Sequence, residues 1–437
     1  MGNYLICSAP ARSHVAPMIT IAAHLHRQGH RVRMLTGRLY EKQVVAAGVE
    51  YVPLPAECDF DDSDLDAAFP GRSAKKGLAR FRFDIDRVFI DAISPEHRAL
   101  QDLIAAERPD AIMVDIGFTG VMPMLVGPRN GRPPIFTGGI APLQFGSRDT
   151  APFGLAKPPS TTTIGRAKNA ALRKFSHFLF RENHRHANEV LRREGVGELP
   201  MFLMDSAVLT DRYLQFCCPS FEYPRSDMPS NVAFVGPMLT PGPATFTPPD
   251  WWDELDGTRP VVHVTQGTID NSDLGRLVGP TIQGLADADV LVVATTCGRP
   301  ASAIPGTIPA NTRIADFIPH AELLPRIQVM ITNGGYGGVQ QALANGVPLI
   351  VAGDTEDKPE VAARVAWSGT GIDLRSGQPT PQAIRRAVDT ILSNTSYRDK
   401  AKQMAEEIAG TSALDAVTAE LEVATDQART TERRTGG

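Results

Sequence analysis

Short apolar segments alternate with helical patterns in two separate series along the chain, and this alternation limits the fold more than any other feature. The first series has apolar segments at 4–7, 32–35, 49–54, 111–114 and 133–137. The second has them at 261–265, 290–294, 313–315, 329–332 and 349–352. Segments of this kind suit strands buried on both faces of a parallel sheet that helices cover. The sequence therefore predicts an α/β protein with two doubly wound, Rossmann-like domains in tandem and a cleft between them.

A proline-rich stretch separates the two series. Residues 239–260 contain Pro241, Pro243, Pro248 and Pro249, a composition typical of a linker. We therefore expect a first domain at 1–238, a linker at 239–260 and a second domain at 261–423, whose last helix could return to the first domain. Residues 424–437 are polar, and a frayed tail is expected there.

Composition excludes several classes of protein. The formal net charge of the 437-residue chain is -5, which gives no reason to expect nucleic acid as a partner. The five cysteines include no CxxC pair and fit reduced thiols, so neither a disulfide framework nor a metal site is expected. No charged leader with an apolar core opens the chain, and no apolar run could span a bilayer. A cytoplasmic location is expected.

A glycine-rich turn is the sharpest local signal. Residues 332–338 read TNGGYGG, follow an apolar strand and open a helix. Glycines let a backbone approach a ligand closely, and amides at a helix N-terminus attract phosphate. A tight turn that needs positive φ is the alternative, and phosphate binding is favoured over it. Neither GxGxxG nor GxxxxGK[ST] occurs, which argues against a dinucleotide dehydrogenase and a P-loop NTPase.

Two polar residues follow strands of the first series. His14 is expected in a loop after the first strand, before a helix that begins at Pro17, and Asp115 ends the strand 111–114. Carboxyl ends of parallel strands share one sheet edge, so the two side chains can meet there. A His–Asp pair makes a base, because the carboxylate fixes the tautomer and stabilises the imidazolium. Helix capping by each residue separately is an equally weighted alternative.

A third group of polar residues follows the strand at 349–352. It comprises Asp354, Glu356, Asp357 and Lys358. Carboxylates at a strand end can accept hydrogen bonds from sugar hydroxyls, and a helix-capping cluster is the alternative.

Taken in order along the chain, these landmarks resemble the GT-B glycosyltransferases of family 1, the group that holds plant UDP-glycosyltransferases and bacterial antibiotic glycosyltransferases. The resemblance covers nearly the whole chain. Its landmarks are residues 13–17 with 27–30, then 234–237, 264–268, 317–320 and the glycine-rich turn continuing to Asp357.

The resemblance implies a role for each matching residue. His14 corresponds to the general base and Asp115 to its carboxylate partner. The residues that would bind the nucleotide sugar are Thr268, Phe317, Ile318, Asn333, Gly334, Gly335, Tyr336, Gly337, Gly338, Gln341, Asp357 and Lys358. Among them, Phe317 would stack on the nucleobase, Ile318 would pair with it through its backbone, and Asp357 and Lys358 would contact the donor sugar.

Several of these positions depart from the family pattern. Asn333 stands where a phosphate-binding His is usual, Gln341 replaces a ribose-binding Glu, and Lys358 replaces a Gln. Gly337 and Gly338 replace polar side chains, so phosphate contact would depend on backbone amides. These changes leave open whether the donor is a UDP- or a dTDP-sugar and which sugar it carries.

The implied activity is inverting transfer of a sugar to a hydroxyl of a hydrophobic natural-product acceptor, without a metal or another cofactor. The acceptor would lie against the first domain, near segments 60–89 and 144–158, with Phe145 and Phe153 in its pocket. A monomer or a homodimer is expected.

Three other functions stay open at this stage. The same fold could serve a sugar-nucleotide epimerase or a non-catalytic sugar-nucleotide binder. It could also serve a lipid-acceptor transferase at a membrane, because 166–186 can form a basic amphipathic helix. A solvated helix face is favoured for 166–186, and for the basic run of Arg72, Lys75, Lys76, Arg80 and Arg82.

Overall fold

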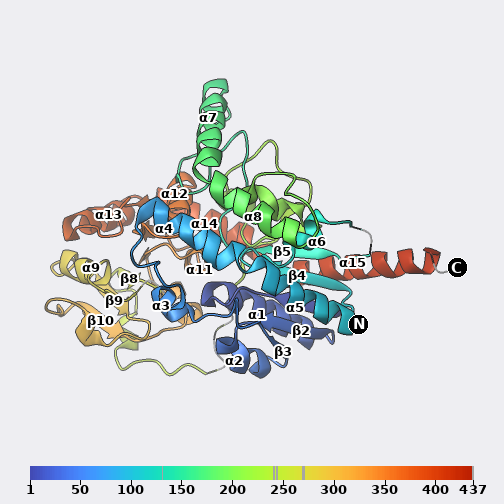
Figure 1. Ribbon diagram of the computed structural model, residues 1–437. Coiled ribbons are helices and arrows are strands. Elements are labelled where there is room, and N and C mark those ends of the chain that lie inside the picture. The colour runs from blue at the N-terminus through green and yellow to red at the C-terminus, as the bar shows by residue number, and fades with distance from the viewer. Residues whose placement is uncertain (130, 240–241, 243–244, 268–270, 436–437) are drawn as a thin grey trace.

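The computed structural model describes the chain except residues 130, 240–241, 243–244, 268–270 and 436–437 (Figure 1). Within the described residues, seven strands form one parallel sheet, ordered β3-β2-β1-β4-β5-β6-β7. These strands are β1 (Asn3–Cys7), β2 (Arg31–Thr36), β3 (Glu50–Pro53), β4 (Ala111–Asp115), β5 (Ile135–Gly139), β6 (Arg212–Gln215) and β7 (Val232–Phe234). This sheet is the centre of the first lobe.

A second parallel sheet forms the centre of the second lobe. The described residues give it six strands, in the order β10-β9-β8-β11-β12-β13. They are β8 (Val261–Thr265), β9 (Leu291–Thr295), β10 (Thr312–Ala315), β11 (Val329–Thr332), β12 (Leu349–Val351) and β13 (Gly371–Asp373). The strand order reverses between β1 and β4 in one sheet and between β8 and β11 in the other. In open sheets of this type, ligands bind beside the carboxyl ends of the strands at such switch points.

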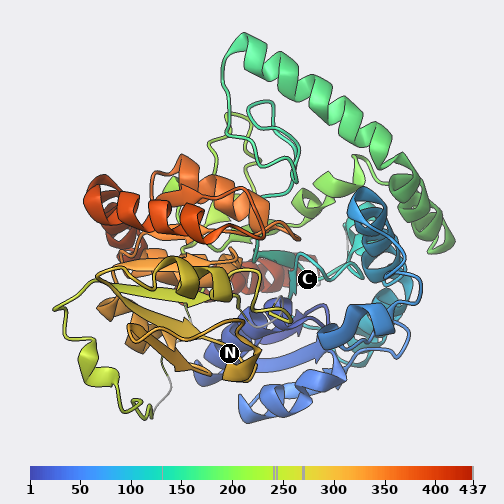
Figure 2. The same cartoon turned by 90° about the vertical axis from the view of Figure 1, so that its left-hand side faces the viewer.

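Helices cover both faces of both sheets (Figures 1 and 2). Those of the first lobe are α1 (Arg12–Arg27), α2 (Glu41–Ala46), α3 (Leu65–Ala68), α4 (Gly77–Asp84), α5 (Ile93–Ala106), α6 (Met122–Val126), α7 (Thr163–Leu179) and α8 (Arg181–Arg193). Those that follow the second sheet's first strand are α9 (Val278–Gly284), α10 (His320–Leu323), α11 (Tyr336–Ala344), α12 (Lys358–Trp367), α13 (Pro381–Ser393), α14 (Ser396–Ala409) and α15 (Ala413–Thr435). None of the helices among the described residues combines the length and the apolar character needed to cross a bilayer.

Each sheet separates two apolar cores. Along β1, Tyr4 and Ile6 pack with α1 on one face, whereas Leu5 and Cys7 pack towards α5 on the other. The same alternation places Val261 and Val262 in different cores of the second lobe. Successive side chains of a strand point to opposite faces, so these runs are apolar throughout. Each fully buried aliphatic side chain contributes about 1.5–3 kcal/mol to stability.

The final helix, α15, leaves the second lobe and packs on the first. Ala413, Val417 and Leu421 join the core formed by α1 and β1, and Arg212 of β6 pairs with Glu420. Helix α15 continues to Thr435, so the polar tail expected from residue 424 is helical at least to that residue.

Several boundaries differ from those expected from the sequence. Helix α1 begins at Arg12 rather than Pro17, because the carboxylate of Asp62 accepts a hydrogen bond from the Arg12 amide at the helix start, 2.7 Å away. His14 therefore lies in the first turn of a helix and not in a loop. The basic stretch 166–186 is divided between α7 and α8 at Phe180, whose ring packs edge-to-face on Phe81.

Four buried charges join the two lobes. The guanidinium of Arg364 on α12 donates to Glu222 of the first lobe at 2.6 and 2.9 Å, and to Glu360 at 2.8 Å. Backbone amides of Leu143 and Gly154 donate to the remaining carboxylate oxygens of Glu222 and Glu360. Arg225 lies 3.9 Å from Glu222, which completes a buried cluster of two cations and two anions. Burial lowers the pKa of Arg364, but the charges of Glu222 and Glu360 outweigh burial and raise it. Arg364 therefore stays charged.

Replacing Arg364 by Met should destabilise the protein by about 3–5 kcal/mol, because the change leaves two buried carboxylates without their main partner. The free energy of unfolding would be measured by urea denaturation. Arg385→Met is the matched control, since Arg385 forms exposed pairs with Asp287 and Asp389 and should cost less than about 1 kcal/mol. Equal losses for the two variants would contradict this role of Arg364.

Candidate active site

A histidine and an aspartate meet at the switch point of the first sheet. The Nδ1 atom of His14, in the first turn of α1, lies 2.6 Å from Oδ1 of Asp115 at the end of β4. Asp115 is buried, and its oxygens also accept hydrogen bonds from the amides of Ala9 at 2.9 Å and Gly117 at 2.6 Å. A carboxylate held in this way accepts the Nδ1 proton, which leaves Nε2 of His14 as the basic nitrogen.

The electrostatic surroundings of His14 include both lobes. Burial lowers the pKa of His14, but the charge and hydrogen bond of Asp115 and the charges of Asp357 and Glu356 outweigh burial and raise it. Asp357 and Glu356 precede α12 in the second lobe. Carboxylates of the other lobe therefore contribute to the electrostatic environment of the imidazole.

Two residues that the sequence interpretation missed support this pair. A Cβ atom at Gly117 would lie 2.8 Å from Nδ1 and Cε1 of His14, so only glycine leaves room for the ring. Behind Asp115, buried Glu96 accepts hydrogen bonds from the amides of Thr119 and Gly120 at 2.8 and 2.7 Å. Burial, with a contribution from Asp115, raises the pKa of Glu96 to about 8. Gly117 and Gly120, two and five residues after Asp115, were the available sequence signal.

The glycine-rich turn lies at the switch point of the second sheet. It follows β11, and Gly335 is the N-cap residue of α11. Gly334 has φ +92, a left-handed conformation that favours glycine. A Cβ atom added at Gly335 or Gly337 would meet no atom within 4 Å, so the first turn of α11 faces open space. Amides in this position can receive an anion.

The polar side chains of this turn contact the protein itself. The Asn333 side-chain amide donates to the Gln266 carbonyl at 2.5 Å. The buried Tyr336 hydroxyl accepts a hydrogen bond from Gln215 of β6 at 2.7 Å, which links the two lobes. Asn333 and Tyr336 therefore anchor the turn, and ligand contact there would come from backbone amides.

The predicted nucleobase contacts follow β10. Phe317 has 65% of its surface exposed, whereas the side chain of Ile318 is buried in the core. The Gln341 side chain is hydrogen-bonded to His320, whose pKa is lowered by burial. Thr268 lies outside the described residues.

The predicted donor-sugar residues begin α12. Burial raises the pKa of Asp357 to about 6, against the opposing charge of Lys358. The Nζ atom of Lys358 contacts Glu356 at 2.5 Å and Thr355 at 3.0 Å. An added Cβ at Gly334 would lie 3.4 Å from the Lys358 carbonyl, so this loop lies directly beside the glycine-rich turn.

Arg276 is a cation that the sequence interpretation missed. A small pocket beside the glycine-rich turn is lined by Arg276, Gln266, Asn333 and Asp354, among others. Arg276 donates to Asp354 at 2.6 Å. The structure thus brings a positive charge close to Asn333, which has none. The sequence from 269 to 275 carries no motif that would have identified it.

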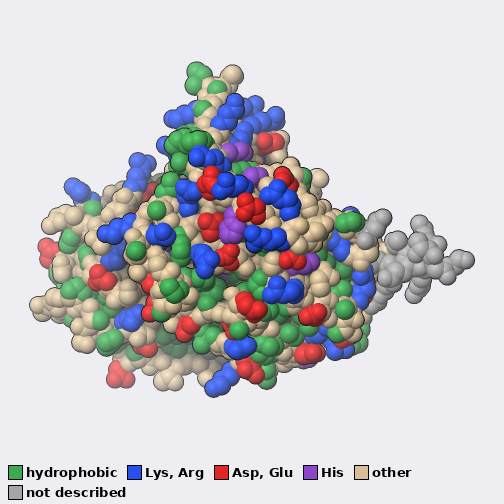
Figure 3. Space-filling view, viewed as in Figure 1, with side chains coloured by type: hydrophobic (Ala, Val, Ile, Leu, Met, Phe, Trp, Pro, Cys, Tyr) green, Lys and Arg blue, Asp and Glu red, His purple; other side chains and the backbone are tan. Residues whose placement is uncertain are grey.

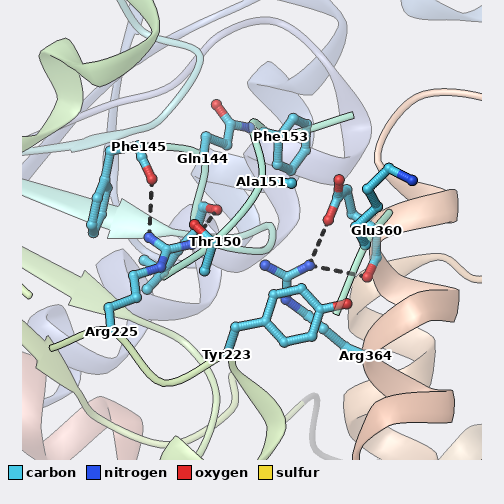
Figure 4. A pocket seen from close by; sticks show the side chains of 11 residues that line it. Gln144, Phe145, Thr150, Ala151, Phe153, Tyr223, Arg225, Glu360 and Arg364 are labelled. Carbon is cyan, nitrogen blue, oxygen red and sulfur yellow. Dashed lines mark hydrogen bonds and ion pairs between the residues drawn. The ribbon is translucent and has the colours of Figure 1, made fainter. Parts of the chain in front are cut away.

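The two predicted acceptor residues line a different pocket, between the lobes (Figure 4). Phe145 is buried under the guanidinium of Arg225, 4.8 Å from the ring centre, and Phe153 lies across the pocket towards Glu360. The pocket's residues include the charged pair Glu360 and Arg364 but neither His14 nor Asp115. The structure therefore brings Phe145 and Phe153 together, and an acceptor role for them stays a prediction.

Two parallel-sheet lobes, with an imidazole base at one switch point and a glycine-rich helix start at the other, define the GT-B class of glycosyltransferase fold. Comparison with known proteins agrees. Residues 280–423 match the family described as "Erythromycin biosynthesis protein CIII-like, C-terminal domain".

Full-length relatives extend this match. The chain is 42% identical over 416 residues to 4'-demethylrebeccamycin synthase of Lentzea aerocolonigenes, covering 94% of this chain and 97% of that one. It is 36% identical over 429 residues to UDP-glycosyltransferase 2 of Phaeomoniella chlamydospora, covering 95% of this chain and 94% of that one. The spinosyn rhamnosyltransferase SpnG, solved with thymidine diphosphate, has the same fold, with a TM-score of 0.65 and 18% sequence identity. The match covers 96% of this chain and 100% of SpnG. The chain belongs to the family 1 natural-product glycosyltransferases.

Replacing Asp115 by Asn should lower the pKa of His14, because burial of the imidazole persists while its nearest negative charge is lost. The pKa would be measured by NMR titration of the histidine ring signals. His177, whose pKa is lowered by burial and whose ring stacks on Phe202, is the internal control and should not move. An unchanged pKa of His14 would show that the pair does not persist in solution.

Proposed function

We propose that this glycosyltransferase moves a sugar from a UDP- or dTDP-sugar to a hydroxyl of a hydrophobic small-molecule acceptor, with inversion at the anomeric carbon. One observation carries the proposal. His14, held by Asp115 on the first lobe, lies within electrostatic reach of Asp357 and Glu356 at the start of α12 on the second. This electrostatic coupling supports a single reaction site shared by the base and the predicted donor-sugar carboxylate.

The proposed reaction is a single displacement. Nε2 of His14 takes the proton of the acceptor hydroxyl while the hydroxyl oxygen attacks the anomeric carbon. The bond between that carbon and the diphosphate oxygen breaks in the same step, and the diphosphate leaves with the bonding electrons. Asp115 keeps Nδ1 protonated and stabilises the imidazolium that forms.

The leaving diphosphate would be bound at the N-terminus of α11. The first turn of α11 faces open space at Gly335 and Gly337, and the helix dipole there favours negative charge. Arg276, which lines the pocket beside Asn333, would add positive charge. No metal is required in this scheme.

The remaining donor contacts follow from the family pattern. Phe317 would stack on the nucleobase, with the Ile318 backbone and the Gln341 side chain nearby, while Asp357 and Lys358 would hold the sugar. Thr268 would approach the diphosphate. A relative named as a UDP-glycosyltransferase and the thymidine diphosphate complex of SpnG support testing both nucleotides. We propose a cytoplasmic monomer or homodimer.

The proposed function is tested by a combinatorial assay read by mass spectrometry. Each UDP- or dTDP-sugar is incubated with each of a panel of hydroxylated aromatics and macrolides. The expected product has the mass of acceptor plus one glycosyl unit, and its anomeric configuration, read by NMR, is opposite to that of the donor. Retention of configuration would contradict the displacement mechanism.

His14→Ala should reduce transfer by about 10²–10⁴-fold, because the acceptor hydroxyl loses its base. Binding of UDP and dTDP, measured by calorimetry, should be unchanged, since the diphosphate site lies on the other lobe. The exposed His26 in α1 gives the matched control His26→Ala, which should retain full activity. Wild-type turnover of His14→Ala would exclude the assigned role.

Gly337→Asp should raise the KM for the donor about tenfold or more, since it places a carboxylate where the diphosphate would bind. The fold should be retained, because an added Cβ meets no atom and an acidic residue suits a helix N-terminus. Gly337→Ala controls for the added carbon and should have a much smaller effect. Similar donor KM values for the two variants would place the diphosphate elsewhere.

A further inference from the structure

Helix α7 projects from the first lobe, and polar contacts hold it there (Figures 1 and 2). Arg166 donates to Asp149 at 2.7 Å, Asn169 donates to the Arg148 carbonyl at 3.3 Å, and Arg173 donates to the Ser147 carbonyl at 2.9 Å. The side of α7 that faces the protein is therefore polar along most of its length.

The opposite side of α7 is apolar and exposed. Ile164, Phe175 and Phe178 have 84%, 59% and 60% of their surface exposed. At 100° per residue, their spacing places the three side chains within about 60° of one another. Ala167 and Ala171 are exposed on the same side. We call these five residues the outer stripe. A contiguous apolar surface that faces away from its own protein marks a contact with something else.

Positive charge borders the outer stripe. Helix α7 carries four Lys and Arg residues together with His177, and no acidic residue. Lys168 and Lys174 are exposed, and the guanidinium of Arg181 lies 4.2 Å from the ring centre of Phe178. Basic and hydrophobic side chains dominate this projection in Figure 3. If α7 of one copy met α7 of a second copy, like charges would face each other, whereas an anionic lipid surface would attract them.

Helix α4 extends this surface at the base of α7. The rings of Phe81 and Phe180 are 5.7 Å apart, and Leu78 and Phe81 remain partly exposed. The basic run that includes Lys75, Lys76 and Arg80 precedes or lies on α4. The two basic stretches, distant in the sequence, are therefore neighbours in the structure, and they have the same mixture of basic and apolar side chains.

We propose that the outer stripe lies on the surface of an anionic phospholipid bilayer, with Phe175 and Phe178 inserted at the headgroup boundary and Lys168 and Lys174 against the lipid charges. This peripheral contact goes beyond sugar transfer and replaces the solvated helix face expected from the sequence. It would bring the segment 60–89, where acceptor contacts are predicted, close to the bilayer.

Flotation of the full-length protein with vesicles tests the proposal. The protein should float with vesicles of phosphatidylcholine and phosphatidylglycerol but not with phosphatidylcholine alone. Phe175→Ser/Phe178→Ser should lower the partition coefficient about tenfold or more, because the apolar anchors are lost. Lys168→Gln/Lys174→Gln should lower it roughly 30-fold, since each basic residue near an anionic surface contributes about a fivefold preference.

The matched control variants change residues on other faces of the protein. Val45→Ser removes an exposed apolar side chain from α2, and Lys400→Gln/Lys402→Gln removes two exposed lysines from α14. Both controls should float as the wild type does, and all variants should transfer sugar to a water-soluble acceptor at the wild-type rate.

Two results would overturn the proposal. One is a wild-type protein that does not float with anionic vesicles. The other is equal flotation of the stripe variants and the controls. If analytical ultracentrifugation instead finds a dimer that Phe175→Ser/Phe178→Ser dissociates, without vesicle binding, the stripe contacts a second copy and the lipid assignment is wrong.

Discussion

The buried charges between the lobes are the constraint on which the site depends. Helix α12 presents Asp357 at its start, and two turns later its Arg364 is held by Glu222 of the first lobe. Burying such charges costs free energy that mutual attraction recovers only when geometry is good and the other polar atoms are satisfied. Backbone amides of Leu143 and Gly154 meet that condition for Glu222 and Glu360. The cluster therefore fixes where the start of α12 lies relative to the first lobe, and with it the position of Asp357 relative to His14.

The burial of the site also affects the pKa values of its ionisable groups. The pKa values of His14 and Asp357 are both raised. Asp357 helps to raise the pKa of His14, whereas burial raises the pKa of Asp357 against the opposing charges of Lys358 and His14. Burial opposes the charge on each, and the neighbouring carboxylates favour a protonated imidazole. Glu96 is buried close to Asp115, and burial raises the pKa of Glu96 to about 8.

The sequence predicted the sheets well and the details of the site less well. Strands at 261–265 and 329–332 were predicted to the residue, because strands buried on both faces read as uninterrupted apolar runs. Strands β6, β7 and β13 were missed; each is short and includes residues that are only partly buried. The glycine-rich turn was recognised, but nothing local reveals that Asn333 and Tyr336 contact Gln266 and Gln215. Arg276 and Glu96 were missed for the same reason, since their partners are distant in the sequence.

Helix α7 shows the limit of sequence periodicity most clearly. An amphipathic pattern states that a helix has a polar and an apolar side, but not which side faces the protein. The usual interpretation of an amphipathic helix places its apolar side against the protein. The basic residues then point outward, and the predicted outer face is solvated. In the structure, Asp149 and the carbonyls of Ser147 and Arg148 accept hydrogen bonds from this helix. The donors Arg166, Asn169 and Arg173 therefore face the protein, and the outer stripe faces outward. The same residues that looked like a solvated face in the sequence therefore form an exposed apolar surface bordered by positive charge.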